Sequence, residues 1–195
     1  MNRNDKRFIK CEQLIREGFI ELLRTTNYND ISINHLCSTL CISKNTFYAH
    51  YLNKDELLHT IVNEQIENVF SIQKSSQQPF DSKNIDDLRF VYIHYFEYIQ
   101  NNSDLLKILF SRDNEINFNT QISHRYKKLF LELINAKHQE THICPDKILM
   151  IDYYVAGGIN FIKNWLLYHQ DTISIAEAQN ILWNLSSETN QFINN

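Results

Sequence analysis

Residues 31–58 read ISINHLCSTLCISKNTFYAHYLNKDELL, and this stretch carries the most structural information in the chain. Ser32 precedes apolar periodicity over 33–40 and Ser43 precedes it over 44–51, so each segment is predicted to be a short helix with a serine at its N-cap. The tight turn between them falls at residues 40–42. Two short capped helices joined in this way predict a helix-turn-helix.

The flanking segments are helical as well. Helical spacing predicts a first helix from about Asp5 to Thr25, and Asn53 to Glu56 is a capping box, with Glu56 at N3, that opens a long amphipathic helix. Beyond a break at 75–82, the same spacing predicts helices over 85–99, 104–110 and 118–137, one from Pro145 at N1 to 169, and one from a second capping box at 174–177 to 192.

The fold class follows from these patterns and from the scarcity of Gly and Pro, three and two residues of 195. We expect an all-α chain of about nine helices, with a three-helix helix-turn-helix domain at 1–53 and a larger helical domain at 54–195.

Composition gives no sign of a membrane or secreted protein. Hydrophobic residues make up 43% and charged residues 22%, which is the ordinary globular mixture. There is no long apolar run and no signal-peptide pattern at the N-terminus, so a soluble, cytoplasmic protein is predicted. The four cysteines form no CxxC pair and are expected to be reduced, with Cys37 and Cys41 acting as buried small hydrophobes instead of a metal site or thiol switch.

The net charge of −4 is unevenly distributed. Residues 1–60 hold 8 Lys/Arg against 7 Asp/Glu, which leaves 11 against 16 for the remainder. Non-specific DNA affinity depends on the number of phosphates neutralised, so a DNA-binding chain with this balance must use a few well-placed contacts and dimerisation.

The central stretch resembles the DNA-binding domain of the TetR family of bacterial transcriptional regulators. The family pattern is Ser-Lys-Gly-Thr-aromatic-Tyr-x-x-Phe followed by Ser-Lys-Glu-x-Leu, and the matching residues here run from Ser43 to Tyr51 and from Asn53 to Leu57. Cys41 replaces the usual turn glycine, and Asn45 replaces a frequent Gly or Pro. Because a cysteine is strained in a left-handed turn, we expect the turn angle to differ slightly.

The second short helix is predicted to read DNA. Lys44 and Asn45 lie at its N-terminal end, where Lys suits guanine and Asn suits adenine. By resemblance, Tyr48, His50 and Lys54 clamp the phosphate backbone. The full set of predicted DNA-binding residues is Ser32, Asn34, Ser43, Lys44, Asn45, Thr46, Tyr48, His50 and Lys54. The core behind them is expected to contain Leu36, Leu40, Ile42, Phe47 and Leu57.

The sequence gives little evidence for a metal site or for an enzyme. His138, His142 and Cys144 have metal-like spacing, but no fourth ligand is identifiable, so solvated loop residues are the default. No Walker loop, HExxH, nucleophile elbow or dinucleotide fingerprint occurs. We therefore expect no enzyme and no cofactor. A helical enzyme using His94 or His124 as a base is disfavoured because nothing positions a partner for either.

The second half also resembles the C-terminal region of TetR-type regulators of low-GC Gram-positive bacteria, including the regulator of dihydroxyacetone kinase, through residues 98–101, 105–111, 156–159 and Trp165. Gly157 and Gly158 in mid-helix suggest close approach by another helix or a ligand. A small aromatic or amphipathic effector is expected in a pocket lined by Tyr92, His94, Phe96, Arg125, Tyr126, Tyr153 and Trp165.

Together these features predict a homodimeric, ligand-responsive repressor that binds a palindromic operator in double-stranded DNA. The alternative is a TetR-like co-activator that acts through a protein partner, its ligand pocket lost. The resemblance places the dimer interface on the last two helices. We expect their apolar residues to be too many for one monomer core: Ile151, Val155, Ile159, Ile162, Leu166, Ile181, Leu182 and Leu185.

Overall fold

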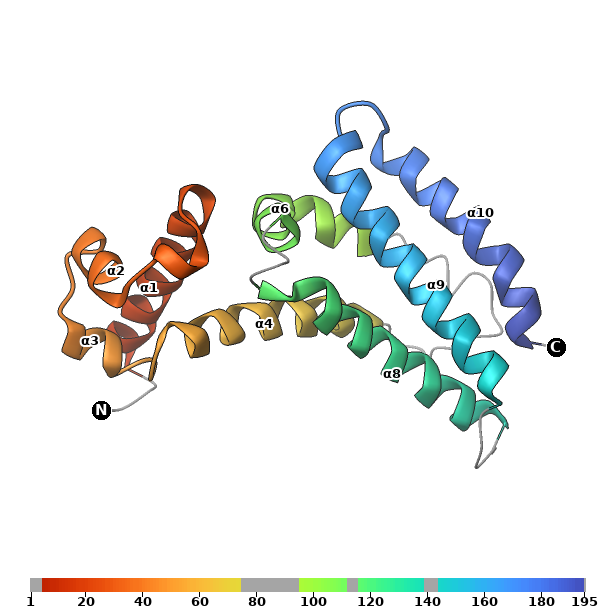
Figure 1. Ribbon diagram of the computed structural model, residues 1–195, viewed down its shortest axis with the longest axis horizontal. Helices are drawn as coiled ribbons and strands as arrows, with labels where there is room; N and C mark the ends of the chain where they lie inside the picture. Colours follow the sequence, from red (N-terminus) through yellow and green to blue (C-terminus); the bar gives the residue numbers. More distant parts are fainter. Residues whose placement is uncertain (1–4, 75–94, 112–115, 139–143, 195) are drawn as a thin grey trace. The chain divides into compact units, whose positions relative to one another are not determined.

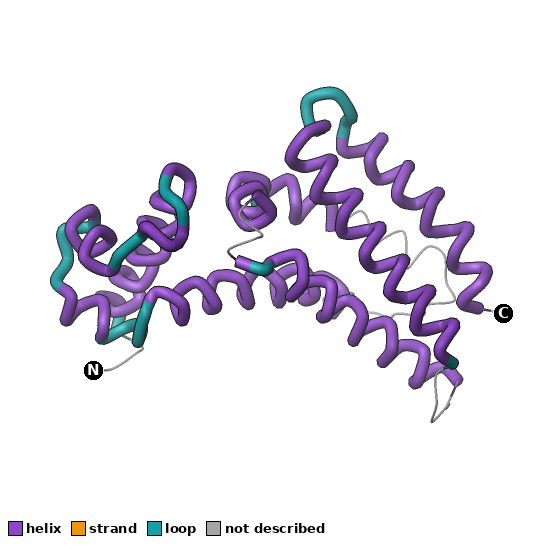
Figure 2. The backbone as a smooth tube through the Cα atoms, viewed as in Figure 1, coloured by secondary structure: helices purple, strands orange, loops and turns teal. Residues whose placement is uncertain are grey.

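The computed structural model describes residues 5–74, 95–111, 116–138 and 144–194, and every regular element in these ranges is helical. Figure 2 accordingly shows helices and loops, and no strand, in the described ranges. The expected all-α fold is confirmed. The chain divides into two compact units, Met1–Gln65 with Asn114–Ile116 and Ile66–Asp113 with Asn117–Asn195. Helix α4 (Lys54–Lys74) contributes residues to both.

The first unit is built from short helices around an aromatic core. It contains α1 (Lys6–Thr25), the 3-10 helix η1 (Tyr28–Asp30), α2 (Ile33–Thr39), α3 (Lys44–Tyr48) and the start of α4 (Figure 1). Of the five predicted core residues, Leu36, Phe47 and Leu57 are fully buried, whereas Leu40 and Ile42 are half-buried. The largest buried side chains of this unit are Ile15, Phe19, Leu23, Ile31, Leu36, Phe47, Leu57 and Ile61.

A glycine allows α1 and α2 to pack closely. The side chain of Leu40 occupies the space that a Cβ atom at Gly18 would need, nearer than real Cβ contacts are found. Gly18 therefore costs some helix propensity in α1 but gives Leu40 a place to pack.

The turn of the helix-turn-helix closes α2 in a Schellman motif. The amide of Ile42 donates to the carbonyl of Cys37 at 3.0 Å, and the amide of Cys41 donates to the carbonyl of Ser38 at 3.3 Å. This pattern needs a left-handed residue just after the helix, and Cys41 has φ 53°. The expectation that the cysteine would change the turn angle was wrong, because the two capping hydrogen bonds hold the residue in the conformation that glycine usually adopts.

The predicted caps are present, with one difference. Ser32 Oγ accepts from the amide of His35 at 3.1 Å and Ser43 Oγ accepts from that of Thr46 at 3.0 Å. Asn53 Oδ1 likewise accepts from the amide of Glu56 at 2.8 Å. Glu56, however, accepts from the amide of Leu52 at 2.5 Å, so the reciprocal bond of the box falls one residue earlier than predicted.

The second capping box forms as expected. Ser174 Oγ accepts from the amide of Glu177 at 3.3 Å, and the Glu177 carboxylate accepts from the amide of Ser174 at 2.9 Å. The Ser174 hydroxyl group also donates to the Glu177 carboxylate at 2.7 Å. This bond and the one from the Ser174 amide lower the pKa of the Glu177 carboxyl group, because they favour its charged form.

The second unit is a layered set of longer helices. Residues 95–101 are helical and are followed by α6 (Ser103–Ser111), α8 (Phe118–His138), α9 (Pro145–Asn164) and α10 (Ile175–Asn194). Figure 1 shows α8, α9 and α10 running alternately up and down beside one another. Pro145 is at N1 as predicted. The helix expected to run to residue 169 does so, but its last turn, Trp165–His169, widens into a π-helix named η2.

Aromatic contacts form much of the core of this unit. Phe96 packs edge-on against Trp165 at 5.4 Å between ring centroids, and Phe110 packs similarly against Phe118 at 5.0 Å. The indole Nε1 of Trp165 donates to the carbonyl of Ile173 at 2.9 Å. This bond ties the start of η2 to the turn that precedes α10.

Fewer apolar residues are exposed on α9 and α10 than the sequence predicted. Ile151, Val155, Ile159, Ile162 and Leu166 are buried within the chain itself, as is Leu182 of α10. Among the side chains that the structure describes, the large apolar ones exposed on these helices and on η2 are Leu149, Tyr153, Tyr168, Ile181 and Leu185. A Cβ atom at Gly157 or Gly158 would meet nothing within 4 Å. Close packing inside the described chain therefore does not explain these glycines.

The four cysteines are free thiols. Cys37 is buried as expected, and burial raises its pKa although Lys44 nearby opposes the shift. Cys41 is exposed, so its prediction as a buried residue was wrong. The αL turn directs this side chain away from the core that Cys37 occupies one turn earlier.

Candidate nucleic-acid interface

Two exposed polar side chains lie at the N-terminal end of α3 without a hydrogen-bond partner in the described part of the chain. Lys44 and Asn45 follow the Ser43 cap directly, and both are exposed. In the described part of the chain, neither side chain makes a hydrogen bond or an ion pair with another residue. An uncommitted cation and amide at the start of a short exposed helix have the donors and acceptors that base edges in the major groove require.

The serine and threonine side chains around them are partly committed to the caps. The hydroxyl groups of Ser43 and Thr46 lie 2.8 Å apart, in addition to the bond between Ser43 Oγ and the Thr46 amide. Ser32 is used in the same way at the start of α2, and Asn34 is exposed two residues later. Hydroxyl groups that accept from an amide can still donate their own proton to a phosphate.

Tyr48 is placed to reach outward from the end of α3. Its side chain is 51% exposed, and its ring packs edge-on against that of Phe47 at 5.6 Å. The contact with the buried Phe47 ring orients Tyr48, and about half of the Tyr48 side chain is left open to solvent.

His50 is placed differently from its prediction as a simple phosphate donor. Its ring lies on that of Phe8 of α1, with 3.9 Å between centroids and an angle of 31°. Both ring nitrogens are buried and lack a hydrogen-bond partner. Burial lowers the pKa of His50, although Glu12 opposes the shift. In this structure the imidazole is a packing surface between α1 and the residues that follow α3.

Lys54 is occupied by the backbone. Its Nζ donates to the carbonyls of Tyr28 at 2.6 Å and Ile31 at 3.0 Å, and lies 4.2 Å from the centroid of the Tyr28 ring. The Tyr28 hydroxyl group in turn donates to Asp55, and burial together with that carboxylate raises the pKa of Tyr28. These contacts tie the start of α4 to the segment that leads into α2.

Sequence reasoning missed Tyr28 and Asp55. The sequence patterns assign residues 27–30 to no element beyond the first helix, and they assign Asp55 only to a capping box. The bond between them spans 27 residues, and no local pattern signals it. A buried tyrosine in an otherwise polar Asn-Tyr-Asn-Asp segment is the one hint that the sequence offers.

The predicted effector residues are only partly brought together. Tyr92 and His94 lie outside the described residues. Phe96 and Trp165 are buried in contact with each other, whereas Tyr153 is 80% exposed on α9. Arg125 pairs with Glu67 of α4 at 3.4 Å and lies over the Phe70 ring, which also contacts Tyr126 at 4.5 Å. Arg125 and Tyr126 thus share a cluster that Tyr153 does not join.

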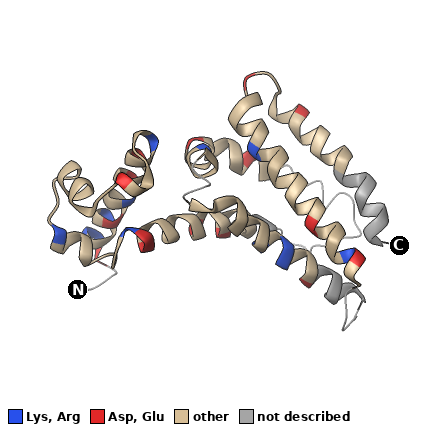
Figure 3. Ribbon diagram, in the orientation of Figure 1, with Lys and Arg blue, Asp and Glu red and all other residues tan. Residues whose placement is uncertain are grey.

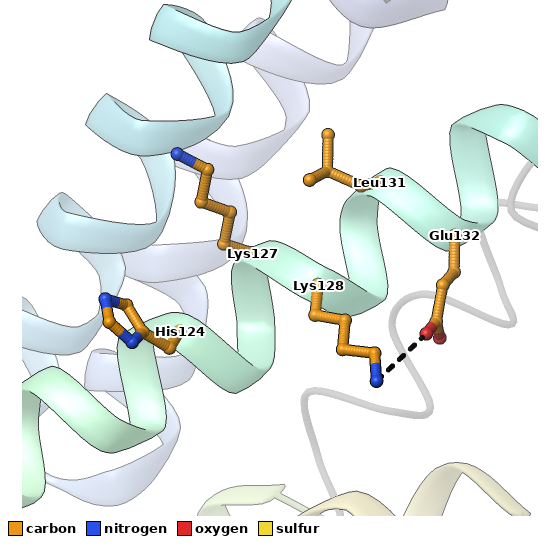
Figure 4. Close-up of a pocket in the computed structure, with 5 residues that line it drawn as sticks. All are labelled: His124, Lys127, Lys128, Leu131 and Glu132. Carbon is orange, nitrogen blue, oxygen red and sulfur yellow. Dashed lines mark ion pairs between the residues drawn. The ribbon is translucent and has the colours of Figure 1, made fainter. Parts of the chain in front are cut away.

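A shallow hollow of about 320 Å³ lies on α8, lined by His124, Lys127, Lys128, Leu131 and Glu132 (Figure 4). None of the predicted effector residues lines it. Lys127 is paired with Asp152 of α9 at 2.6 Å, and Lys128 with Glu132 at 3.9 Å. Both lysines at this hollow therefore have a carboxylate within ion-pair distance.

The metal-like spacing of His138, His142 and Cys144 lies mostly outside the described residues. The side chain of His138 and all of His142 lie outside the described residues, and Cys144 is exposed. Among the residues that are described, no group of three His, Cys, Asp or Glu side chains has a metal-binding arrangement.

Comparison with known families identifies the chain. Residues 86–182 match the TetR_C_8 family, described as a transcriptional regulator C-terminal region. The chain belongs to the TetR family of transcriptional regulators. The resemblance inferred from residues 43–57 is thereby confirmed from the other half of the sequence.

Two curated relatives match over short stretches. The uncharacterized HTH-type transcriptional regulator YxbF of Bacillus subtilis is 32% identical over 59 residues, 30% of this chain and 16% of that protein. The HTH-type dhaKLM operon transcriptional activator DhaS of Lactococcus lactis is 33% identical over 58 residues, 30% of this chain and 31% of that protein. The matches thus span less than a third of either relative.

Solved structures of TetR regulators share the whole fold. One from Syntrophomonas wolfei superposes with a TM-score of 0.72 at 14% identity, covering 93% of this chain and 95% of that one. A second, from Streptococcus agalactiae, gives 0.68 at 16% identity, covering 93% and 96%. The dihydroxyacetone kinase operon activator DhaS gives 0.61 at 17% identity, covering 94% and 98%.

Membership of this family agrees with the expectation that the chain is not an enzyme, since these TetR relatives and neighbours are transcriptional regulators. Within the described ranges, no helix is both long and apolar enough to span a membrane.

Proposed function

We propose that this TetR-family chain binds double-stranded operator DNA as a homodimer, in the cytoplasm, and regulates transcription in response to a small-molecule effector. One observation carries the DNA-binding part of the proposal. Lys44 and Asn45 stand exposed and uncommitted at the capped start of α3, where a recognition helix meets base edges. Tyr48 and the hydroxyl groups at the starts of α2 and α3 supply phosphate contacts beside them.

The roles within the predicted site differ. We assign base reading to Lys44 and Asn45, and backbone contact to Ser32, Asn34, Ser43, Thr46 and Tyr48. Lys54 holds three carbonyls, so we assign it chiefly to positioning the start of α2, with phosphate contact as a secondary role. His50 packs on Phe8, which makes it a positioning residue for the end of α3. We keep a boundary between DNA-binding and effector domains at residues 53–54 as a proposal.

The test is a binding comparison on two DNAs. The operator is first selected from fragmented genomic DNA with the purified protein, and affinities for it and for a mixed-sequence duplex are then measured by fluorescence anisotropy. Lys44→Ala and Asn45→Ala should each weaken operator binding by roughly 1–3 kcal/mol while affecting the mixed duplex less. Tyr48→Phe should weaken both alike. Lys128→Ala in the second unit is the control and should change neither.

Homodimerisation is supported by an apolar surface on α9 and α10. Leu149, Tyr153 and Gly157 follow one another at four-residue spacing on α9, and all three are exposed. Ile181 and Leu185 are exposed on α10, which packs beside α9. Such a surface, open at the glycine, suits the close approach of a second copy. A two-fold dimer implies a palindromic operator.

This surface can be tested by substitution. The double variant Leu149→Glu, Tyr153→Glu should be monomeric by multi-angle light scattering at concentrations where the wild-type protein is dimeric. Leu52→Glu, which alters a leucine that is 77% exposed in the first unit, is the matched control. A wild-type protein that is monomeric at micromolar concentration would refute the dimer.

The sign of regulation has two candidates. A repressor released by its effector is the first: an effector favouring one of two dimer conformations lowers operator affinity by its differential binding energy. Activation is the second, and the similarity to DhaS, which is named as an operon activator, favours it specifically. Transcription in vitro from the selected operator, with and without the protein, separates the two directly.

A further inference from the structure

Three residues, Tyr28, Lys54 and Asp55, bond the start of α4 to the segment that leads into α2, and we call them the Tyr28 cluster. The Tyr28 hydroxyl group donates to the Asp55 carboxylate. Lys54 Nζ donates to the carbonyls of Tyr28 at 2.6 Å and Ile31 at 3.0 Å, and it lies over the Tyr28 ring. Figure 3 shows basic and acidic residues side by side at the start of α4.

The ring and the hydroxyl group of Tyr28 have different roles. The ring is buried in the core, edge-on to that of Phe19 with 6.4 Å between centroids. A phenylalanine would fill this position equally well, because the core contacts are made by the ring. The hydroxyl group adds a bond to Asp55, which is exposed in the first turn of α4. A hydrogen bond to a carboxylate is roughly twice as strong as one between neutral groups, so this bond holds η1 against the start of α4.

The Tyr28 cluster also fixes the backbone that leads into α2. The amide of Ile31 donates to the carbonyl of Tyr28 at 3.2 Å, and the Ile31 side chain is buried. Lys54 binds the carbonyls at both ends of this short turn. An ammonium group that donates to both carbonyls fixes the directions of their peptide groups. Ser32, the N-cap of α2, follows Ile31 directly, so its position depends on the turn.

Ser32 and Asn34 are the residues at the start of α2 that we assign to the phosphate backbone. Both are exposed, and Ser32 Oγ accepts from the amide of His35 at 3.1 Å, which ties its position to the first turn of α2. Their side chains are short, so the backbone determines where their polar atoms lie. Hydrogen bonds need a distance of about 2.7–3.2 Å between donor and acceptor, so a shift of about 1 Å at the start of α2 would break such contacts.

We propose that Tyr28 and Asp55 are positioning residues for DNA binding: the bond between them holds the start of α2 where Ser32 and Asn34 reach the phosphate backbone. This rests on the proposed DNA-binding function and adds two residues that act on DNA binding through α2. Phosphate contacts carry no sequence information, so loss of the bond weakens binding to every duplex alike. Ser32 and Asn34 are uncharged, so the loss leaves counterion release, and with it the salt dependence, unchanged.

The test compares DNA affinity across hydroxyl deletions. The full-length protein is titrated with the selected operator and with the mixed-sequence duplex over a range of KCl concentrations, at a temperature where circular dichroism shows every variant to be folded. Tyr28→Phe should bind both DNAs about three- to tenfold more weakly than the wild type, the size expected for one or two hydrogen bonds, with an unchanged slope of log K against log salt. Thr60→Val removes another hydroxyl group of the first unit, which donates to the carbonyl of Glu56 at 2.8 Å, and should bind as the wild type does.

Two substitutions of Asp55 separate the hydrogen bond from the charge. Asp55→Asn and Asp55→Ala both remove one negative charge, but only asparagine keeps an oxygen atom that can accept from Tyr28. Asp55→Ala should therefore bind both DNAs about three- to tenfold more weakly than Asp55→Asn. Adding Tyr28→Phe to Asp55→Ala should weaken binding little further, because the bond is already absent.

A further background tests whether the Tyr28 cluster acts through the start of α2. The double variant Ser32→Gly, Asn34→Ala removes both proposed phosphate donors, and glycine is tolerated at an N-cap. In this background Tyr28→Phe should change DNA affinity by less than about twofold, because the contacts that it displaces are gone. Any effect of Tyr28→Phe on the melting temperature should persist there, which separates positioning from stability.

The outcomes separate this proposal from the one on which it rests. If the wild-type protein binds DNA and Tyr28→Phe binds both DNAs as tightly, or Asp55→Ala binds like Asp55→Asn, the positioning role is refuted while DNA binding stands. A slope reduced by about 0.9 in Tyr28→Phe would mean that the bond acts through a phosphate contact of Lys54, which refutes the assignment to the start of α2. A full loss of affinity from Tyr28→Phe in the Ser32→Gly, Asn34→Ala background refutes it as well. If the wild-type protein binds no DNA, both proposals fail.

Discussion

Replacing Cys41 with glycine should stabilise the helix-turn-helix. Cys41 has φ 53°, in the left-handed region that residues with a Cβ atom avoid, and it is held there by the two bonds that close α2. Its side chain is exposed, and its only polar contact is a weak one from Sγ to the carbonyl of Ser38 at 3.9 Å. The substitution therefore removes a steric penalty and almost no packing.

The size of the effect follows from two opposing terms. The left-handed conformation costs a residue with a Cβ atom roughly 1–2 kcal/mol. Glycine avoids that cost but makes the unfolded chain more flexible, which opposes folding by about 0.4–1 kcal/mol. Cys41→Gly should thus raise the free energy of unfolding by about 0.5–1 kcal/mol.

The assay is urea denaturation followed by far-UV circular dichroism and by hydrogen exchange of amides in α2. Cys41→Ala removes the thiol but keeps the Cβ atom, and it should stay close to the wild-type stability. Ser38→Gly places a glycine at an exposed position inside α2, and should lower stability by about 0.5–1 kcal/mol. A Cys41→Gly protein no more stable than Cys41→Ala would refute the reasoning, since relief of the left-handed strain should outweigh the added flexibility of the unfolded chain.

Three further predictions test other contacts of the first unit. Gly18→Ala should destabilise the first unit by about 1–3 kcal/mol because the new Cβ atom overlaps with Leu40, despite the better helix propensity of alanine. In the Gly18→Ala protein, Leu40→Ala should cost less stability than it does in the wild type, as a double-mutant cycle in urea would show. Lys54→Met should lower the free energy of unfolding by about 1–2 kcal/mol even without DNA, because the partly buried carbonyls of Tyr28 and Ile31 lose their donor. Unchanged stability would return Lys54 to a purely phosphate-binding role. Burial lowers the pKa of His50 in the folded state. Stability should therefore fall as the pH drops below about 6.5, because the unfolded chain takes up the proton first. His50→Gln should flatten this dependence in thermal melts between about pH 7 and 5.

Local patterns in the sequence accounted for the elements of the first unit. Ser32, Ser43 and Asn53 each bond to the amide three residues later, and such caps can be recognised in the sequence because donor and acceptor are close along the chain. The left-handed turn was missed for the opposite reason. Sequence reasoning considered the preference of cysteine alone, whereas two hydrogen bonds from the end of α2 outweigh it.

Contacts between distant residues account for the remaining differences in the site. His50 meets Phe8, and Lys54 meets carbonyls more than twenty residues away. Neither contact has a local signature, so both residues resembled free surface donors in the sequence.

The sequence likewise did not show which face of α9 is buried. Apolar residues occupy more than one of its faces, and only the packing of α8 and α10 shows that Ile151 and Val155 point inward while Leu149 and Tyr153 point outward. Periodicity can show that a helix has two apolar faces, but the neighbouring helices determine which one is covered.

The bond between Trp165 and Ile173 also has a practical consequence for spectroscopy. The chain has two tryptophans, Trp165 and Trp183, and both belong to the second unit. Tryptophan emission therefore reports on the second unit alone, and the first unit contributes only tyrosine absorption and emission. Loosening of η2 would expose the Trp165 indole to water and shift its emission to the red. A denaturation curve followed by tryptophan and another followed by backbone ellipticity would thus separate the unfolding of the two units within a single unlabelled sample.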